Sequence, residues 1–454
     1  MSGTLVVDDG ALAELSTTFS GDLIRPGDAS FDEARRVHNG LVDKRPGLIA
    51  RCRGTADVVD AIRFATQRGI PISVRGGGHN VAGRSVIDDG VVIDLGPMKG
   101  LVVDPSSRTA HAQGGVTWRE FNRETAVHGL ATTGGFVSTT GIAGLTLGGG
   151  FGWLMGKHGL AADNLVSAEV VTARGEVITT SEAEHPDLFW ALRGGGGNFG
   201  VVTGFEYRLH PLAQVVGGLV AHPFDAAGDV LRFFRDLTQD LPDELGTFAG
   251  LVHAPDGSGA KLAAIVVCHA GDPAQAEIDL KTLTDFGSPL ISQIGPMPYP
   301  VINTMFDDAY PRGALNYWKS SFLRGLDDGV IDRSIEGFAS CPSPMTAIAF
   351  EDFHGAVTRV PVDATAVPHR EPGYDLLITS VWTDPATTDD NIAWTRSTFG
   401  TLEGSFAGRR YVNYLDDDDP SDEAFGSDRR RLAQVKRTYD PDDEFRSTHR
   451  IAPA

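Results

Sequence analysis

Residues 73–83 read Ser73-Val74-Arg75-Gly76-Gly77-Gly78-His79-Asn80-Val81-Ala82-Gly83, so a short apolar run ends in three glycines and a histidine. Consecutive glycines can adopt positive φ angles and let backbone N–H groups close on a phosphate, which suits a loop around a pyrophosphate. A tight turn with a solvated histidine explains the same residues, because glycine-rich turns are common. The neighbouring segments must therefore decide between a binding loop and a plain turn.

The segment before this loop predicts a helix followed by a strand. Thr55 is expected to cap the helix, Asp57 lies in its first turn where the helix dipole favours a negative charge, and Gly69 ends it. Pro71 then leads into a strand at residues 72–74. The glycines follow a strand but do not open a helix with GxGxxG spacing, so the order argues against a nicotinamide-dependent dehydrogenase.

The region after the loop predicts short strands alternating with helices. A second helix is expected from Thr117, its cap, to His128, and Pro186 is well placed in the first turn of a third. Arg174-Gly175 marks the turn of a hairpin. Further strand candidates lie at residues 91–95, 101–103 and 109–112. This alternation is typical of an α+β fold.

Two more glycine-rich blocks occupy residues 132–152 and 194–203. Small residues at this density allow the backbone to approach a flat ligand closely, although glycines that only permit tight turns would give the same pattern. From about residue 213 the glycine clusters vanish, and strands at 262–268, 347–350 and 376–382 are expected. We therefore predict one domain from residues 1–212, completed by 408–454, and a second from residues 213–407.

The carboxy-terminal part contains three further features. Tyr411–Leu415 reads as a strand, and residues 428–437 read as a helix. The run Asp416-Asp417-Asp418-Asp419 lacks the spacing of oxygen ligands around a metal, so a solvated loop is the preferred interpretation.

The composition limits the classes of function. A chain of 454 residues with 41% hydrophobic content can form more than one packed unit, and a formal net charge of -21 argues against binding to nucleic acid or an anionic membrane surface. Cys52, Cys268 and Cys341 are widely separated, which supports neither a disulfide framework nor a zinc site. The first nine residues contain no secretory leader pattern, so a cytoplasmic location is expected.

Taken in order, the three glycine blocks and Tyr411-Val412-Asn413-Tyr414 resemble the FAD-linked oxidases of the vanillyl-alcohol-oxidase superfamily, in particular its berberine-bridge-enzyme-like and 6-hydroxynicotine-oxidase-like members. The resemblance implies an α+β fold in which a two-part, PCMH-type FAD-binding domain encloses a substrate domain with an antiparallel sheet covered by helices. The matching segments are residues 75–79, 134–152, 158–164, 188–203 and 411–445.

The resemblance also implies where FAD binds. It places the pyrophosphate on the loop Arg75–Gly78, a covalent bond to the flavin 8α-methyl carbon on His79, adenine against the backbone of Val201 and Val202, and Asn413 near the isoalloxazine edge. An imidazole is a nucleophile near neutral pH, which suits this attachment. The expected cofactor-binding residues are Arg75, Gly76, Gly77, Gly78, His79, Asn80, Gly83, Thr140, Gly141, Gly144, Gly148, Gly149, Val201, Val202, Tyr411 and Asn413.

Two positions bear on how the flavin is held and reoxidised. Relatives with a second covalent link carry a cysteine where this chain has Val137, so attachment through His79 only is expected. Thr140 falls where relatives use a small or a larger apolar residue to admit or exclude oxygen. Threonine matches neither pattern, so the choice of an oxidase over a flavin dehydrogenase is only a preference.

The reaction implied by the resemblance is hydride transfer from an alcohol or amine carbon of a small organic substrate to flavin N5, with O2 reduced to H2O2. Tyr414, Glu351 and His354 are the candidates for the catalytic base, and a structural role is equally compatible with each. Strand alternation puts Glu351 and Phe353 on one face and Asp352 and His354 on the other. A non-catalytic flavin-binding protein is the alternative from another class, and the sequence carries no signal for oligomeric state.

Overall fold

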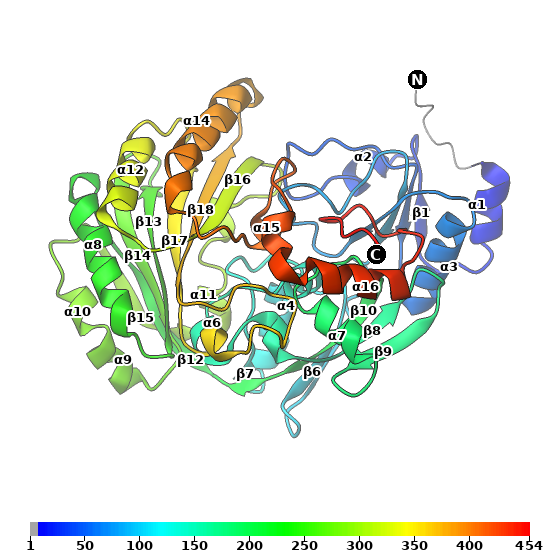
Figure 1. Cartoon of the computed structure of the whole chain (residues 1–454), viewed down its shortest axis with the longest axis horizontal. Helices are drawn as coiled ribbons and strands as arrows, with labels where there is room; N and C mark the ends of the chain where they lie inside the picture. The colour runs from blue at the N-terminus through cyan, green and yellow to red at the C-terminus, as the bar shows by residue number, and fades with distance from the viewer. Residues whose placement is uncertain (1–7) are drawn as a thin grey trace.

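The computed structural model describes residues 8–454 and contains two halves joined side by side (Figure 1). Residues 1–7, which begin the segment where no leader is expected, lie outside the described part. Three main sheets organise the molecule, two in the half that holds the amino terminus and one in the other half. Within residues 8–454 no helix is long and apolar enough to cross a membrane.

The first sheet has the strand order β1-β2-β4-β3, with β2, β4 and β3 parallel to one another and β1 antiparallel to β2. Its strands are β1 (Asp22–Ile24), β2 (Leu48–Arg51), β3 (Ile72–Arg75) and β4 (Val91–Asp94). The same part of the chain contains the helices α1 (Asp9–Leu15), α2 (Phe31–Ala34) and α3 (Thr55–Thr66). The predicted cap of α3 is wrong: Gly54 is the N-cap residue, and Thr55 begins the helix. The Thr55 hydroxyl instead donates to the Glu169 carboxylate at 2.7 Å, a tertiary contact that a local capping rule does not consider.

The second sheet is antiparallel, with the order β5-β6-β10-β8-β9. Its strands are β5 (Leu101–Asp104), β6 (Thr109–Gln113), β8 (Leu165–Val171), β9 (Val177–Ser181) and β10 (Val201–Arg208). The predicted helices are present as α4 (Trp118–Ala126) and α7 (Pro186–Leu192), and Thr117 forms the capping box of α4 with Glu120. A small ladder pairs β7 (Leu130–Ala131) with β11 (His210–Pro211), and α5 (Ile142–Leu147) and α6 (Met155–His158) lie in and after the second glycine block.

The third sheet is entirely antiparallel and has seven strands in the order β15-β12-β14-β13-β17-β18-β16. The strands are β12 (Gln214–Pro223), β13 (Leu245–His253), β14 (Lys261–His269), β15 (Ile291–Pro298), β16 (Leu315–Leu323), β17 (Ala347–Phe353) and β18 (Gly373–Trp382). Helices α8 (Ala227–Leu237), α12 (Asp328–Ala339) and α14 (Thr388–Thr401) cover its outer face (Figure 1). The shorter helices are α9 (Pro273–Asp279), α10 (Lys281–Thr284), α11 (Tyr299–Ile302) and α13 (Ala356–Arg359).

The chain then returns to the amino-terminal half through α15 (Asp422–Phe425) and α16 (Arg429–Tyr439), and α16 packs its Leu432 and Val435 into the same core as α4 and α7. The strand predicted at 411–415 is wrong, because Val412–Tyr414 form one turn of 3₁₀ helix. In such a turn residues three apart lie on one side. Tyr411 and Tyr414 accordingly meet with ring centroids 4.8 Å apart, whereas a strand would turn them to opposite faces.

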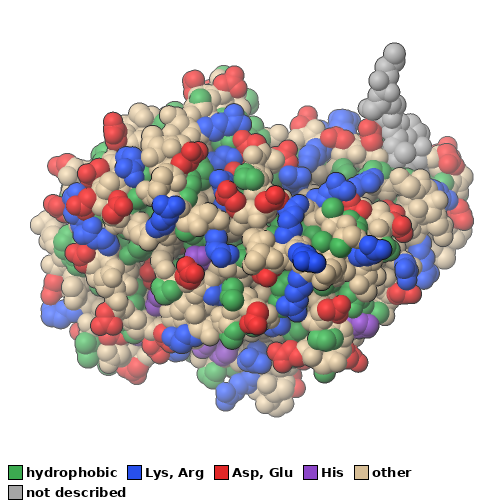
Figure 2. Space-filling model, viewed as in Figure 1, with side chains coloured by type: hydrophobic (Ala, Val, Ile, Leu, Met, Phe, Trp, Pro, Cys, Tyr) green, Lys and Arg blue, Asp and Glu red, His purple; other side chains and the backbone are tan. Residues whose placement is uncertain are grey.

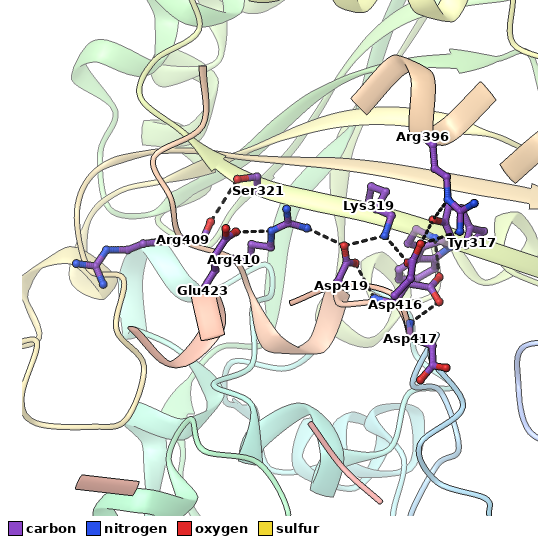
Figure 3. A network of polar contacts seen from close by, with 12 residues as sticks. Tyr317, Lys319, Ser321, Arg396, Arg409, Arg410, Asp416, Asp417, Asp419 and Glu423 are labelled. Carbon is purple, nitrogen blue, oxygen red and sulfur yellow. Dashed lines mark hydrogen bonds and ion pairs between the residues drawn. The ribbon is translucent and has the colours of Figure 1, made fainter. Parts of the chain in front are cut away.

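The acidic run forms the predicted loop, but only Asp417 and Asp418 are solvated. Asp416 is buried and the Asp419 side chain is only 3% exposed. Asp419 pairs with Lys319 of β16 and with Arg410, at 2.7 Å in each case (Figure 3). Buried cations need anionic partners, and these carboxylates supply them, so the run fastens the returning segment to β16.

These layers form an α+β architecture in which the first two sheets and the last helices stand on one side of the seven-stranded antiparallel sheet, as predicted. The boundaries at residues 212 and 408 stay a prediction. Acidic and basic side chains are intermixed on the face of the molecule shown in Figure 2.

Candidate functional site

A cavity of about 1000 Å³ lies between the glycine blocks and the inner face of the seven-stranded sheet. All three glycine blocks, the turn at 411–414 and the sheet contribute to its wall. The residues singled out by the sequence that line it are Gly76, Gly77, Gly78, His79, Asn80, Thr140, Gly141, Gly144, Val202, Glu351, Tyr411, Asn413 and Tyr414. Segments more than 300 residues apart in the chain thus share one site.

The first two glycine blocks touch each other at the cavity wall. A Cβ on Gly77 would lie 2.4 Å from the backbone nitrogen of Gly141, and a Cβ on Gly141 would lie 2.4 Å from that of Gly77. Gly78 has a φ of 70°, which disfavours a side chain for conformational reasons. The wall here consists of bare backbone, and a cofactor that carries a pyrophosphate and a flat ring system fits such a wall.

His79 lies at the end of this loop with its ring stacked on that of His38, the centroids being 3.8 Å apart. Thr139 Oγ1 lies 2.9 Å from Nε2 of His79, and Thr140 Oγ1 lies 3.4 Å from Nδ1. Burial, and to a smaller extent the nearby His38 and Arg312, hold the pKa of the His79 imidazole well below its usual 6.5. The ring is therefore neutral at physiological pH and retains a nucleophilic lone pair.

Tyr411 and Asn413 brace the second glycine block. The Tyr411 hydroxyl accepts the backbone N–H groups of Gly150 (3.0 Å) and Phe151 (3.1 Å), and its ring stacks on Phe151 with centroids 3.7 Å apart. Asn413 Nδ2 donates to the Tyr411 hydroxyl at 2.8 Å. A Cβ on Gly148 would lie 2.1 Å from Asn413 Oδ1, so this glycine makes room for the amide.

Glu351 and Tyr414 form the polar pair of the sheet-side wall. The Tyr414 hydroxyl donates to Glu351 Oε1 at 2.9 Å, while Glu351 Oε2 has no hydrogen-bond partner among residues 8–454. Burial raises the pKa of the Glu351 carboxyl to about 8 and holds the pKa of Tyr414 well above its usual range. Asp375 is the direct cross-strand neighbour of Glu351 and is fully buried. The pair therefore holds a carboxyl that is mostly protonated at neutral pH and becomes a proton acceptor as the pH rises through about 8.

His354 lies apart from this pair. Its imidazole forms an ion pair with Asp352, and its Nε2 lies 3.4 Å from the carbonyl oxygen of Pro242. Phe353 packs against Phe151 on the Glu351 side of β17, so the predicted alternation of faces is observed. Of the three candidate bases, the structure brings together Tyr414 and Glu351.

Several predicted cofactor-binding residues have other contacts. Arg75 forms a buried ion pair with Asp94 at 2.8 Å. Gly83 has a φ of 64° and abuts Val42, and Val201 packs in the core around α3. Gly149, with a φ of 111°, faces Val367. None of these four predicted residues is among those that line the cavity, so their role in binding a cofactor stays a prediction.

The sequence reasoning missed several residues of the cavity wall. His38 belongs to no recognisable motif, and Trp318 and Tyr310 join the wall only because of how β16 and the loop before it are placed. Thr448 and His449 also line the cavity. Strand alternation around Glu351 could have indicated an inner and an outer face, but the register between distant strands carries no local signal.

Family models match both ends of the chain. A model for an FAD binding domain matches residues 46–181, and a model described as berberine and berberine like matches residues 410–452. The first match contains the Arg75–His79 loop and the second glycine block, and the second contains Tyr411–Tyr414. The cradle of bare backbone described above therefore lies within a recognised FAD-binding segment.

Relatives match over most of the chain. The (R)-6-hydroxynicotine oxidase of Paenarthrobacter nicotinovorans is 34% identical over 330 residues, which cover 71% of this chain and 69% of the relative. The FAD-linked oxidoreductase aurO of Gibberella zeae is 30% identical over 428 residues, covering 93% of this chain and 84% of the relative. The crystal structure of 6-hydroxy-D-nicotine oxidase from Arthrobacter nicotinovorans has a TM-score of 0.88 at 29% identity and covers 96% of this chain and 98% of its own.

Proposed function

This chain belongs to the berberine-bridge-enzyme-like and 6-hydroxynicotine-oxidase-like FAD-linked oxidoreductases, and from that membership we propose that it oxidises an alcohol or amine carbon of a small organic molecule with O2 as the final acceptor. The observation that carries the proposal is the Glu351–Tyr414 pair, which lines the same cavity as the glycine cradle and His79. In the overall reaction the substrate loses a hydride from carbon and a proton from oxygen or nitrogen, and O2 becomes H2O2.

FAD fits the cavity and, when bound, supplies the acceptor for the hydride. The bare backbone at Gly76–Gly78 and at Gly141 and Gly144 would hold its pyrophosphate and ring system, and Tyr411 and Asn413 keep the second block in shape. The neutral imidazole of His79 is the group that we propose forms the covalent link. Val137 also lines the cavity and has no thiol, so we propose a single attachment.

Glu351 and Tyr414 would take the proton that leaves the substrate hydroxyl or amine. Glu351 Oε2 is the free acceptor, and the Tyr414 hydroxyl fixes the carboxyl through Oε1. A base whose pKa lies near the working pH is efficient, and burial moves the pKa of Glu351 in that direction. We assign His354 to holding the end of β17 through Asp352, not to proton transfer.

Acid precipitation tests the covalent link. The purified chain should be yellow, and the colour should remain with the precipitate. His79→Ala should move the flavin to the supernatant, whereas the exposed His128→Ala should behave like the parent protein. A colourless precipitate beside a yellow supernatant from the parent protein would rule out the link.

Anaerobic titration tests the catalytic role. Alcohols and amines that are substrates should bleach the flavin absorbance, and readmitted oxygen should restore the colour with one H2O2 per substrate oxidised. Bleaching that oxygen does not reverse would identify a dehydrogenase with another acceptor. A spectrum that no alcohol, amine or sugar changes would favour a non-catalytic flavin-binding protein.

A further inference from the structure

The inner face of the seven-stranded sheet carries a row of small residues that runs across the strands. Their registers place one cavity-lining residue from each of six of the seven strands in a single line perpendicular to the strand direction. The row consists of Ile291 (β15), Ala221 (β12), Ala264 (β14), Gly250 (β13), Ala349 (β17) and Leu377 (β18). Its four central members have at most a methyl group, so the row forms a trough.

Larger apolar side chains border this trough on both sides. The neighbouring line of the sheet contains Leu219, Val266, Phe248 and then Glu351, again in direct register. On the opposite side lie Leu262 and Val252, which pair with each other. All of these residues line the cavity. A trough bordered in this way accepts a flat molecule lying across the strands.

Polar side chains are few among the residues of this sheet that line the cavity. Among the residues of this sheet that line the cavity, only Gln293, Glu351, Trp318 and His253 carry polar side-chain atoms. Glu351 is 5% exposed, and Glu351 Oε2 and Trp318 Nε1 both have no hydrogen-bond partner among the described residues. Glu351 and Trp318 lie toward one edge of the sheet, and Gln293 lies on β15 at the other edge. His253, whose Nδ1 also has no hydrogen-bond partner among the described residues, lies on β13. The row of small residues between these edges is apolar. A sugar would leave most of its hydroxyls without partners there, whereas an apolar ring would not.

We propose that the substrate is a flat, mainly apolar molecule of two or more rings that lies along the small-residue row and presents one hydroxyl or amine to Glu351 and Tyr414. This inference rests on the proposed oxidation at the same site. The row from Ala221 on β12 to Ala349 on β17 crosses three interstrand steps of about 4.8 Å each, which is enough for three linear rings. Specificity then comes from the length and flatness of the trough, and Glu351 fixes which end of the molecule reacts.

Binding to the FAD-loaded protein tests the inference without requiring turnover. The probes are 4-hydroxybenzyl alcohol (one ring), 2-(hydroxymethyl)anthraquinone (three rings) and the disaccharide cellobiose, and equilibrium dialysis measures each dissociation constant. The three-ring probe should bind about tenfold or more tightly than the one-ring probe, because more apolar area is buried. Cellobiose should bind weakest. Tighter binding of cellobiose than of the three-ring probe overturns the inference.

Filling the trough at different distances from Glu351 locates the ligand. Ala264→Leu should raise the dissociation constant of the three-ring probe by about tenfold, since only the longer molecule reaches β14. The dissociation constant of the one-ring probe should stay within about twofold of its value in the parent protein. Ala349→Leu, next to the reacting end, should weaken both probes. Ala274→Leu on the exposed side of α9 is the matched control and should change neither.

Ala221→Leu on β12 provides a second distant position if Ala264→Leu does not fold. Unchanged three-ring affinity in a folded variant that fills the trough overturns the inference. If the ring probes bind in the expected order but never bleach the flavin, the proposed oxidation fails while the trough assignment stands. If alcohols or amines bleach the flavin but the ring probes bind in the reverse order of affinity, the trough assignment fails while the proposed oxidation stands.

Discussion

At the scale of single residues, Glu351 and Asp375 place two carboxyl groups side by side in a buried position. They are direct partners across β17 and β18, and neither Asp375 oxygen has a hydrogen-bond partner in the described part of the chain. Burial and the nearby Glu351 hold the pKa of Asp375 well above its usual range. Two adjacent buried carboxyls do not both ionise easily, so the pair retains a proton where isolated acids would have lost theirs.

This pair gives kcat/KM a defined pH dependence. Because burial raises the pKa of Glu351 to about 8, the deprotonated base accumulates as the pH rises through 8, and kcat/KM should rise with it and then level off. Glu351→Gln should lower kcat/KM by about 10²–10⁴-fold and remove that rise. Stopped-flow reduction of the flavin across the pH range measures both. A rise near pH 8 that persists in Glu351→Gln would assign the base elsewhere.

The raised pKa of Glu351 also affects the stability of the flavin-free protein: kcat/KM should rise with pH, whereas the free energy of unfolding should fall. Between pH 4.5 and about 8 the unfolded state has lost the Glu351 proton while the folded state retains it, so the free energy of unfolding falls as the pH rises. Each such proton contributes a slope of about 1.4 kcal/mol per pH unit. Glu351→Gln should therefore show a shallower fall in urea titrations from pH 5 to 8, and an equal slope in the two proteins would contradict the buried, protonated carboxyl.

At the scale of single elements, α16 is fixed by an ion pair with no exposed surface. Lys436 Nζ lies 2.5 Å from Asp440 Oδ2 and donates to the carbonyl oxygens of Asn198 (2.9 Å) and Phe445 (3.1 Å). The lysine therefore connects the last helix to the third glycine block. Its removal leaves the buried Asp440 carboxylate with the backbone N–H groups of Glu444 and Phe445 but without its cation.

We predict that Lys436→Met lowers the free energy of unfolding by about 3–5 kcal/mol, the usual cost of breaking a buried ion pair from one side. Arg437→Met, on the next residue of α16 and exposed, should cost less than about 1 kcal/mol. Chemical denaturation of both flavin-free variants compares them. Equal losses would show that the buried contacts of Lys436 add nothing to the stability of the fold.

The acidic run provides a second comparison between neighbouring residues. Asp419 is nearly buried between Lys319 and Arg410 (Figure 3). The Asp417 side chain, in contrast, is 69% exposed and pairs with Arg84. Asp419→Ala should lower the free energy of unfolding by about 3 kcal/mol or more, and Asp417→Ala should lower it by about 0–1 kcal/mol. Urea denaturation measures both losses. The reverse order would mean that the run is solvated after all.

Elements whose ends depend on local chemistry were predictable from the sequence. Thr117 caps α4 and Pro186 begins α7 because both roles require only the next few residues. Thr55 and the turn at 411–415 were not predictable, because Glu169 draws the Thr55 hydroxyl away and Phe151 draws Tyr411 and Tyr414 to one side. Asp419 looked solvated because its cationic partners come from other parts of the fold.

At the scale of the whole molecule, the cavity lies between parts that are distant in the chain, so its occupant should stabilise the fold as a unit. A ligand that binds only the folded state raises the free energy of unfolding. His79→Ala protein from which the non-covalently held flavin has been stripped should therefore melt several degrees below the loaded parent protein, and loaded His128→Ala should match the parent. Scanning calorimetry measures the difference, and coincident transitions would argue against a flavin held between the two halves.

The glycine loop, His79 and the order of the glycine blocks were enough to indicate the cofactor site from the sequence. The sheet-side wall was not predictable from local sequence. Glu351 meets Asp375 through the register of β17 and β18, and it meets Tyr414 from a turn 63 residues further along the chain. The trough at Ala221–Ala349 depends on strand registers as well. Recurrent local motifs thus mark the half with the glycine blocks, while long-range strand pairing builds the sheet-side wall of the cavity.

The return of the chain to its first half has a consequence for biosynthesis. Thr448 and His449 line the same cavity as His79, and Lys436 fastens α16 to the third glycine block. The pocket is therefore incomplete on the ribosome until residue 449 has left the exit tunnel. We expect cofactor capture only after residue 449 has emerged, and a nascent chain stalled at residue 400 should be colourless.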